Sequence, residues 1–303
     1  MAHPGCRLHR LRRLHGGQDA TVHRVELLLP TGRIAVVLRR YRAETLAWNP
    51  HGPARLAQTL TAVAQAGLPT PRLLATELDG RTLGAPALLL SYLSGRGELQ
   101  PPKPQRYLRQ LAALLARIHA VPASLPGLAH LPPPPAQLES WLRAALTSPR
   151  LAADPDGAAF TRALEFAAAE PASLLRSPSL VHGDYWAGNV LAQRGQLSAV
   201  IDWDQAALGS GGYDLGYCRV DLALLFGMEA ARDFLAAYEQ QSGSRIAPAA
   251  LATWDLLAAT RALPDGSGWL TGYHGLGRTD LHASLLGRRL RTFIKDALAR
   301  SPS

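Results

Sequence analysis

Three polar residues near the middle of the sequence carry side chains that bind cations or accept protons: Asp184, Asn189 and Asp202. Turn residues at 193–196 predict a hairpin of strands Val190–Ala192 and Leu197–Ile201, which returns Asp202 to the end where Asn189 stands. A carboxylate placed as a base, beside a carboxamide–carboxylate pair, suits Mg²⁺ held together with phosphate oxygens. The spacing therefore predicts a metal–nucleotide site. The alternative is an Asx-rich hairpin with ordinary turn roles.

The residues before this centre predict a small β-rich lobe. Its last apolar strand, Ala87–Leu93, leads into a glycine-containing hinge at residues 94–97. A helix at Pro53–Gln65 has apolar residues at helical spacing. The other strands are expected at Leu8–Leu14, Val22–Leu29, Arg33–Arg40 and Arg72–Ala75.

Two features of this lobe are suited to phosphate. Gly16 and Gly17 lie in the turn after the first strand, where glycine lets backbone N–H groups approach an anion closely. Arg39, near the end of the third strand, is a cation placed to reach the same phosphates. The alternatives are an ordinary hairpin turn for the glycines and a solvated strand end for Arg39.

The residues after the hinge predict a larger, mainly helical lobe. Gln105–Ala120 has an amphipathic stripe and includes His119, for which we expect a hydrogen-bonded structural role. Prolines 132–135 predict a stiff surface connection. Further helical patterns occupy Gln137–Thr147, Ala158–Ala169, Cys218–Phe226, Ala230–Gln241, Ala249–Ala262 and Leu281–Arg300. We expect an α+β fold in which residues 1–93 bind nucleotide and residues 94–303 carry the reactive centre and the acceptor site.

Composition narrows the class of protein. The 303 residues contain no apolar run near the ~20 residues of a membrane span, and Met1–Arg13 lacks the apolar core of a signal peptide. Cys6 and Cys218 have no metal-like spacing, and two unpaired thiols suit a reducing cytoplasm; neither is assigned a role. We expect a cytoplasmic protein with no membrane partner.

The net charge of +9 raises the question of a nucleic-acid partner. Five Asp and no Glu lie between residues 180 and 221, whereas the basic excess lies mainly before residue 42 and after residue 288. An acidic centre within a basic periphery is the opposite of a nucleic-acid groove. No aromatic–basic motif supports that class either, so we expect no nucleic-acid partner.

The sequence His182-Gly183-Asp184, followed by Asn189 and then Ile201-Asp202-Trp203, resembles the aminoglycoside phosphotransferase and choline kinase family. That family is the small-molecule branch of the protein-kinase-like fold, with a small antiparallel β lobe carrying one helix and a larger helical lobe. The resemblance covers about residues 8–295. Its other landmarks, in the family's order, are Gly16-Gly17, Leu38-Arg39-Arg40, Pro71, the Pro86–Leu93 run, Leu111–His119 and Asp214-Leu215-Gly216.

The resemblance implies a role for each residue of the centre. Asp184 would accept the proton of a substrate hydroxyl and aim its oxygen at the γ-phosphate of ATP or GTP. Asn189 and Asp202 would ligate Mg²⁺. His182 and Asp214 would brace the loop that carries Asp184.

The same resemblance places Gly16, Gly17 and Arg39 at the nucleotide phosphates and the backbone of Ser91 and Leu93 at the base. The family usually has a lysine where Arg39 stands, and the two cations are not equivalent. Its usual glutamate partner is also missing: Leu56 stands near that position, and no acid occurs between Glu44 and Glu77. Glu44 and Gln58 are the candidate replacements.

The acceptor is less well determined than the reaction. Candidate acceptor-binding residues, chosen by location among the C-terminal helices, are Asp221, Trp254, Asp255 and Tyr273; Trp254-Asp255 equally suits an anchor and cap at a helix start. An aminoglycoside-like antibiotic, an amino alcohol, a sugar and another metabolite all stay open, as does the oligomeric state. The competing hypothesis, motivated by the missing glutamate, is a catalytically impaired kinase-like protein that binds nucleotide or a partner.

Overall fold

The computed structural model describes residues 5–14, 19–169, 174–175 and 178–301. The chain forms two compact units. The first contains Met1–Ser94 and Ala199–Asp204, and the second contains Gly95–Ser198 and Gln205–Ser303. The expected boundary near residue 93 did not include the return of residues 199–204 to the first unit. Within that unit, the Val200 N–H donates to the Pro69 carbonyl at 2.8 Å and so attaches the returning segment.

The first unit is built on a five-stranded antiparallel sheet of order β1-β2-β3-β5-β4. The five strands predicted for this lobe are present. In the register of this sheet, Arg39 lies between Val22 of β2 and Leu88 of β5. The strands are β1 (Arg7–Leu14), β2 (Ala20–Leu29), β3 (Gly32–Tyr41), β4 (Leu73–Glu77) and β5 (Ala87–Ser91).

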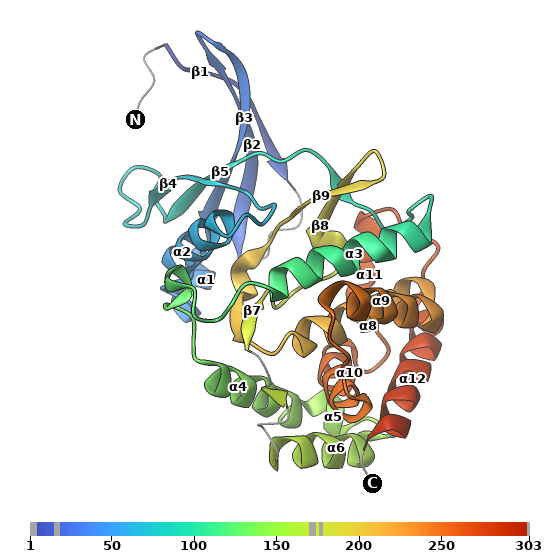
Figure 1. Cartoon of the computed structure of the whole chain (residues 1–303). Coiled ribbons are helices and arrows are strands. Elements are labelled where there is room, and N and C mark those ends of the chain that lie inside the picture. The colour runs from blue at the N-terminus through green and yellow to red at the C-terminus, as the bar shows by residue number, and fades with distance from the viewer. Residues whose placement is uncertain (1–4, 15–18, 170–173, 176–177, 302–303) are drawn as a thin grey trace. The chain divides into compact units, whose positions relative to one another are not determined.

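Two helices accompany this sheet, α1 (Ala43–Trp48) and α2 (Gly52–Gln65). The apolar stripe of α2 is buried and includes Leu56, Leu60 and Val63, and the helix packs on β4 and β5. The helix predicted at Pro53–Gln65 is thus confirmed. The six-residue α1 was not predicted, because so short a helix does not show an apolar periodicity in the sequence. Figure 1 shows both helices near the end of β3.

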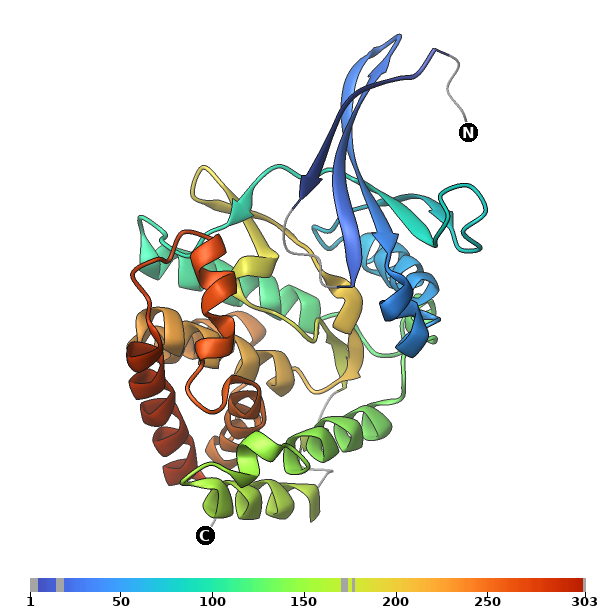
Figure 2. The same cartoon turned by 180° about the vertical axis from the view of Figure 1, so that it is seen from behind.

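The second unit is mainly helical. Helix α8 is its centre: 13 of its residues are buried, and it packs against α9, α10 and α12. Helix α3 packs on α9, and α12 runs at one edge of the group in both views (Figures 1 and 2). The helices are α3 (Pro104–His119), α4 (Pro134–Leu146), α5 (Pro149–Ala152), α6 (Gly157–Ala169), α8 (Gly212–Phe226), α9 (Met228–Ser242), α10 (Pro248–Ala262), α11 (Leu270–Gly275) and α12 (Ala283–Arg300).

Two short sheets lie in the same unit. Strand β7 (Ser179–Val181) pairs with β10 (Ala207–Gly209), and β6 (Arg96–Gly97) pairs with β8 (Val190–Gln193). Strand β9 (Gln196–Val200) follows β8 through a turn in which Arg194 has φ +53° and Gly195 has φ +75°. The hairpin predicted from turn residues 193–196 is confirmed.

Two boundaries differ from the prediction for physical reasons. The proline run does not end before α4, because Pro134 forms the first turn of that helix, where a missing N–H costs no helical bond. Helix α8 begins at Gly212, six residues before the predicted start at Cys218. Glycines at its beginning obscured the pattern, but a Cβ at Gly216 would lie 2.3 Å from the Trp254 carbonyl oxygen of α10. The close contact between these two helices requires glycine there.

No helix among the described residues is both long enough and apolar enough to cross a membrane.

Candidate active site

The loop after β7 holds Asp184 in a fixed conformation. Gly183 has φ +83°, and a Cβ there would lie 2.1 Å from the Gln205 carbonyl oxygen, so only glycine fits. The Asn189 amide nitrogen donates to the Asp184 side chain and to the Asp184 carbonyl, both at 2.9 Å. Two of the three residues singled out in the sequence therefore lie together within the second unit.

Asp214, at the start of α8, supports this loop from inside the unit. Its two carboxylate oxygens accept the backbone N–H groups of His182 at 2.7 Å and Gly183 at 2.8 Å, and the side chain is fully buried. His182 in turn accepts the Asp184 N–H on its Nδ1 at 3.2 Å. These contacts fix the backbone on both sides of Gly183.

His119, at the end of α3, extends the support. Its Nε2 lies 3.1 Å from Asp214 Oδ2, and its Nδ1 lies 2.8 Å from the Tyr238 hydroxyl. A Cβ at Gly211 would come within 2.4 Å of the His119 ring. The ring is thus locked between a carboxylate and a phenol, which agrees with the structural role expected for this histidine.

Arg261, on α10, is the residue beside Asp184 that the sequence did not suggest. Its guanidinium lies 3.8 Å from the Asp184 carboxylate and donates to the Gly183 carbonyl at 3.4 Å. It also lies over the Tyr217 ring, 4.4 Å from the centroid, and donates to the Tyr213 hydroxyl at 3.3 Å. No sequence signal marked it, because an arginine near the end of a helix is usually a solvated side chain.

Within the first unit, Arg39 has two carboxylate partners. Its guanidinium donates to Asp204 at 2.8 Å and to Asp202 at 3.5 Å, and its side chain is only 13% exposed. Burial raises the pKa of Asp204 above its ordinary value; the Arg39 charge opposes this rise and the neighbouring Asp202 adds to it. One Asp204 oxygen, Oδ2, is buried without a hydrogen-bond partner. The pair therefore depends on the single contact that Asp204 Oδ1 makes.

This pair answers the question of the missing acid. Among the described residues, the ion pairs of Arg39 are made with the returning segment, and neither Glu44 nor Gln58 supplies them. Leu56 of α2 is buried in the apolar contact with the sheet. A carboxylate 165 residues along the chain thus pairs with Arg39, where the sequence suggested Glu44 or Gln58.

Asp202 has a backbone conformation that is unusual for its type. Its φ is +67°, and among the described residues only Arg194 shares a positive φ without being glycine. Aspartate tolerates this left-handed region better than most residues, but it still costs about 1 kcal/mol. The Asp202 side chain is 46% exposed, so this conformation presents a carboxylate to solvent.

The side chains of Asn189, in the second unit, and Asp202, in the first unit, are each of a type that binds Mg²⁺. Asn189 uses its amide nitrogen on Asp184, which leaves its amide oxygen as the group able to take a metal. Asp202 supplies a partly exposed carboxylate. The described residues hold no group of three or more His, Cys, Asp or Glu side chains arranged for a metal. One amide and one carboxylate suit an ion that keeps waters and phosphate oxygens as its other ligands.

Of the residues expected at the nucleotide, Gly16 and Gly17 lie outside the described residues. Ser91 ends β5: its N–H donates to the Arg72 carbonyl at 2.8 Å, and its hydroxyl accepts the Arg72 N–H at 2.9 Å. Leu93 follows it and is partly exposed. The expected hinge at residues 94–97 thus follows, after residues 92 and 93, a strand whose end is fixed by hydrogen bonds, and its last two residues form β6.

A family model for the phosphotransferase enzyme family matches residues 10–256. The chain belongs to the phosphotransferase enzyme family. This confirms the resemblance. The mouse (Mus musculus) acyl-CoA dehydrogenase family member 10 is 28% identical over 200 residues, which are 60% of this chain and 18% of that protein. The chain therefore spans less than a fifth of that relative.

Solved structures confirm the two-lobed α+β fold expected for this family. The macrolide 2'-phosphotransferase of Brachybacterium faecium is 21% identical with a TM-score of 0.60, and the alignment covers 99% of this chain and 95% of that one. The structure of the GDP and kanamycin complex of APH(2")-IIia is 16% identical in sequence with a TM-score of 0.63, and the alignment covers 97% of this chain and 94% of that one. A choline/ethanolamine kinase family protein from Mesorhizobium loti is 18% identical with a TM-score of 0.56, and the alignment covers 96% of this chain and 92% of that one.

Two of the acceptor candidates of this phosphotransferase-family protein contact each other inside the second unit. The Tyr273 hydroxyl donates to Asp221 at 2.8 Å, and both side chains are buried. Burial raises the pKa of Asp221 to about 7, although the Tyr273 hydrogen bond opposes the shift. The Ala187 N–H, in the loop that carries Asp184, points to Asp221 at 3.5 Å. These contacts place Asp221 behind the loop.

The other two candidates lie in the middle of α10, so the alternative of an anchor and cap at a helix start is wrong. Asp255 is fully buried and accepts hydrogen bonds from Arg219 at 2.9 and 3.0 Å and from Arg300 at 2.8 Å. Trp254 is buried against Trp141, with ring centroids 6.5 Å apart. Their present contacts are structural, and contact with an acceptor stays a prediction.

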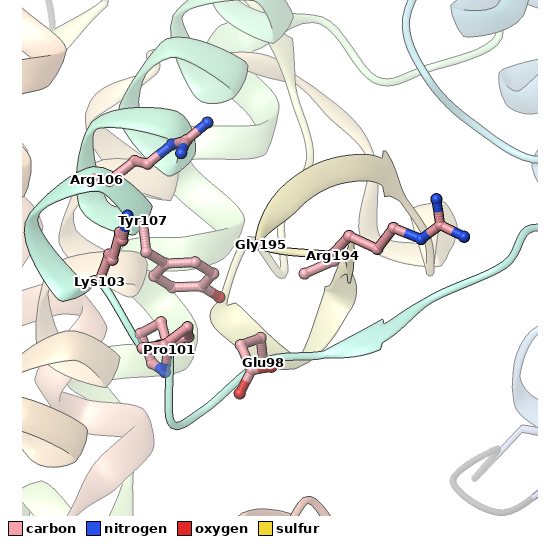
Figure 3. Close-up of a pocket in the computed structure, with 9 residues that line it drawn as sticks. Glu98, Pro101, Lys103, Arg106, Tyr107, Arg194 and Gly195 are labelled. Carbon is pink, nitrogen blue, oxygen red and sulfur yellow. The ribbon is translucent and has the colours of Figure 1, made fainter.

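A small hollow of about 210 Å³ lies in the second unit between the start of α3 and the turn before β9. It contains Glu98, Lys103, Arg106, Tyr107 and Arg194, and the Tyr107 hydroxyl is buried without a hydrogen-bond partner. Figure 3 shows the guanidinium groups of Arg106 and Arg194 pointing away from the Tyr107 ring. The cations do not converge, so the hollow does not resemble an anion site.

Proposed function

We propose that this protein is a small-molecule kinase that transfers the γ-phosphate of ATP or GTP to a hydroxyl group, with Mg²⁺ as cofactor. The observation that carries the proposal is the Asp184 carboxylate, held by Asn189 at 2.9 Å on a loop that Asp214 braces from below. Membership of a phosphotransferase family supports the same reaction class. The APH(2")-IIia complex contains GDP, which supports a nucleotide as the donor.

In this reaction, Asp184 hydrogen-bonds the acceptor hydroxyl and aims its oxygen at the γ-phosphorus. The acceptor oxygen forms a bond to phosphorus while the bond from phosphorus to the β–γ bridging oxygen breaks. The hydroxyl proton passes to Asp184 and the nucleoside diphosphate leaves. Such a loose transition state requires alignment more than a strong base, so an ordinary aspartate is sufficient.

The other residues position the donor. Asn189 and Asp202 would hold Mg²⁺, which supplies positive charge that neutralises the phosphate oxygens when it is bound. Arg39, oriented by Asp204, would contact the same phosphates. The turn at Gly16 and Gly17 would cover them.

The nucleotide base would lie against the hinge, where the backbone of Ser91 and Leu93 can read its edge. Phosphate donors of this kind are abundant in the cytoplasm, which is where we place the protein; the two cysteines are free thiols. We propose neither a nucleic acid nor a membrane as a partner.

The test is a screen of purified protein with Mg²⁺, ATP or GTP, and a panel of hydroxylated compounds. Nucleoside diphosphate release above a blank without acceptor is the readout, followed by mass detection of the phosphorylated product. We expect release with at least one acceptor. Binding of Mg²⁺-nucleotide without transfer to any compound would favour the catalytically impaired alternative.

A further inference from the structure

A cavity of about 520 Å³ lies in the second unit, lined by α4, the segment after it, and α10. Helix α4 contributes Trp141, the following segment contributes Arg150, and α10 contributes Leu257, Thr260 and Arg261. The size is that of an ordinary small-molecule site. None of the residues proposed above for metal or nucleotide binding lines it.

The cavity reaches the Asp184 loop. Arg261 forms part of its lining and lies 3.8 Å from the Asp184 carboxylate. Gln205 also lines it, and the Gln205 carbonyl is the group that lies directly against Gly183. Asp184 itself does not line the cavity, but Arg261 connects the lining to the residue proposed to receive the proton of the acceptor.

One wall of the cavity is aromatic. The rings of Trp141 and Tyr213 stack with centroids 3.7 Å apart and an interplanar angle of 12°. A Cβ at Gly209 would lie 3.2 Å from the Trp141 ring, so glycine at this position leaves room for the indole ring. A rigid aromatic wall favours an acceptor with an apolar face.

The charged groups of the lining are of one sign. Arg150 and Arg261 line the cavity, and no Asp or Glu does so among its lining residues. Two buried carboxylates elsewhere in the unit are paired with cations: Asp255 with Arg219 and Arg300, and Asp154 with Arg291. A polycationic acceptor would meet two guanidinium groups here, whereas an anionic one would meet complementary charge.

We propose that this cavity is the acceptor site and that it selects an anionic alcohol with an apolar face over any cationic acceptor. Its acid group lies toward Arg150, its apolar part lies on the Trp141–Tyr213 wall, and its hydroxyl lies toward Asp184. This rests on the proposed function for the reaction, and it adds the substrate class. It also opposes an aminoglycoside, which is one of the acceptors that the sequence left open.

Three probes of closely similar size vary the charge: mandelate, 1-phenylethane-1,2-diol and 2-amino-1-phenylethanol. Each has a phenyl ring and a secondary hydroxyl, and they differ in carrying a carboxylate, a neutral hydroxymethyl group or an ammonium. Calorimetric titration of the Mg²⁺-nucleotide-loaded protein measures binding without turnover. We expect mandelate to bind about five- to tenfold more tightly than the amine, with the diol between them.

The matched variants are Arg150→Glu, which inverts a cavity charge, and Arg162→Glu. Arg162 is exposed on α6 and does not line the cavity, so it changes the net charge equally. Arg150→Glu is expected to weaken mandelate about fivefold and to strengthen the amine by a similar factor. Arg162→Glu is expected to leave both affinities within twofold of the wild type.

Equal or tighter binding of the amine in the wild type would overturn the inference. So would undetectable binding of mandelate, or equal effects of the two arginine variants. Nucleoside diphosphate release with the amine alone would leave the kinase function standing and refute only the substrate class. Absence of release with every acceptor would refute the kinase function, while calorimetry would still decide the charge preference.

Discussion

The guanidinium of Arg39 on β3 donates to the carboxylate of Asp204 at 2.8 Å, and both side chains are largely buried in the first unit. The sequence of α2 offers no acid for this cation. The partner comes instead from residues 199–204, which return to the unit after more than a hundred residues spent elsewhere. Because Asp202 belongs to the same short segment, one excursion of the chain supplies both the expected metal ligand and the carboxylate that orients Arg39.

Asp204→Asn tests the function of this contact. The variant keeps the shape of the side chain and removes the charge, so Arg39 is held less firmly at the phosphates. We expect the KM for ATP or GTP to rise about tenfold, since a hydrogen bond to a charged group is worth about 1.5–3 kcal/mol. Steady-state kinetics at a saturating concentration of acceptor measure this KM. The control is Glu44→Gln, an exposed acid that does not pair with Arg39; an equal effect of the two variants would contradict the assignment.

Asp184→Asn tests the proposed base. The amide still accepts a hydrogen bond but cannot receive a proton, so we expect kcat to fall about 10²- to 10⁴-fold. The dissociation constant of Mg²⁺-nucleotide should stay within about threefold, because the proposed contact of Asp184 is with the acceptor and not with the nucleotide. Single-turnover kinetics and nucleotide titration separate the two effects. Asp79→Asn, in an exposed loop of the first unit, is the control. A variant that turns over at more than a tenth of the wild-type rate would remove Asp184 from the chemistry.

Asp202→Ala tests the metal assignment. Wild-type protein is expected to bind nucleotide more tightly with Mg²⁺ than with EDTA, and the variant should lose most of that difference. The proposed ligand is gone, while the contact of Arg39 with Asp204 is retained. Nucleotide affinity with and without Mg²⁺ is the measurement. A variant with an unchanged Mg²⁺ dependence would show that the metal is held by other groups.

The sequence predicted the parts of this protein that depend on local patterns. Alternation and helical spacing found the long strands and the helices such as α2 and α3, and the resemblance gave the fold. The Asp204 partner of Arg39 was not found, because a contact across 165 residues depends on tertiary packing and leaves no local trace. The same holds for Arg261, whose position beside Asp184 exists only once α10 packs in the second unit.

Gly183→Ala tests how strictly the Asp184 loop is specified. A Cβ at this position would lie 2.1 Å from the Gln205 carbonyl, and φ is +83°. Gly195 is a matched control, because its φ is +75° but no atom lies within 4 Å of a Cβ built there. We expect Gly195→Ala to cost about 1–2 kcal/mol from backbone strain alone, and Gly183→Ala to cost about 1–3 kcal/mol more from overpacking. Urea unfolding measures both, and equal costs would show that the loop relaxes freely.

Asp221 predicts a pH dependence of stability. Burial raises the pKa of Asp221 to about 7 in the folded protein, against 3.8 ordinarily. Between these values the folded state retains a proton that the unfolded state has lost, so the free energy of unfolding falls as the pH rises through this window. In Asp221→Asn the amide can still accept the Tyr273 hydroxyl and does not titrate. Relative to the wild type, the variant should therefore gain roughly 2–3 kcal/mol between pH 5 and pH 8.

Urea unfolding of both proteins at unit steps of pH measures this difference. Asp280→Asn is the control, because the Arg278 hydrogen bond lowers the pKa of that exposed carboxyl. The stabilisation by the ionised Asp280 carboxyl is fully present above the pKa that this group has in the unfolded chain, and it is lost only in more acidic solution. The free energies of unfolding of this variant and of the wild type should therefore differ by a constant amount from pH 5 to pH 8. If Asp221→Asn also ran parallel, the Asp221 carboxyl would have to be ionised in the folded protein throughout that range, stabilised by Tyr273 and the Ala187 N–H more strongly than its burial implies.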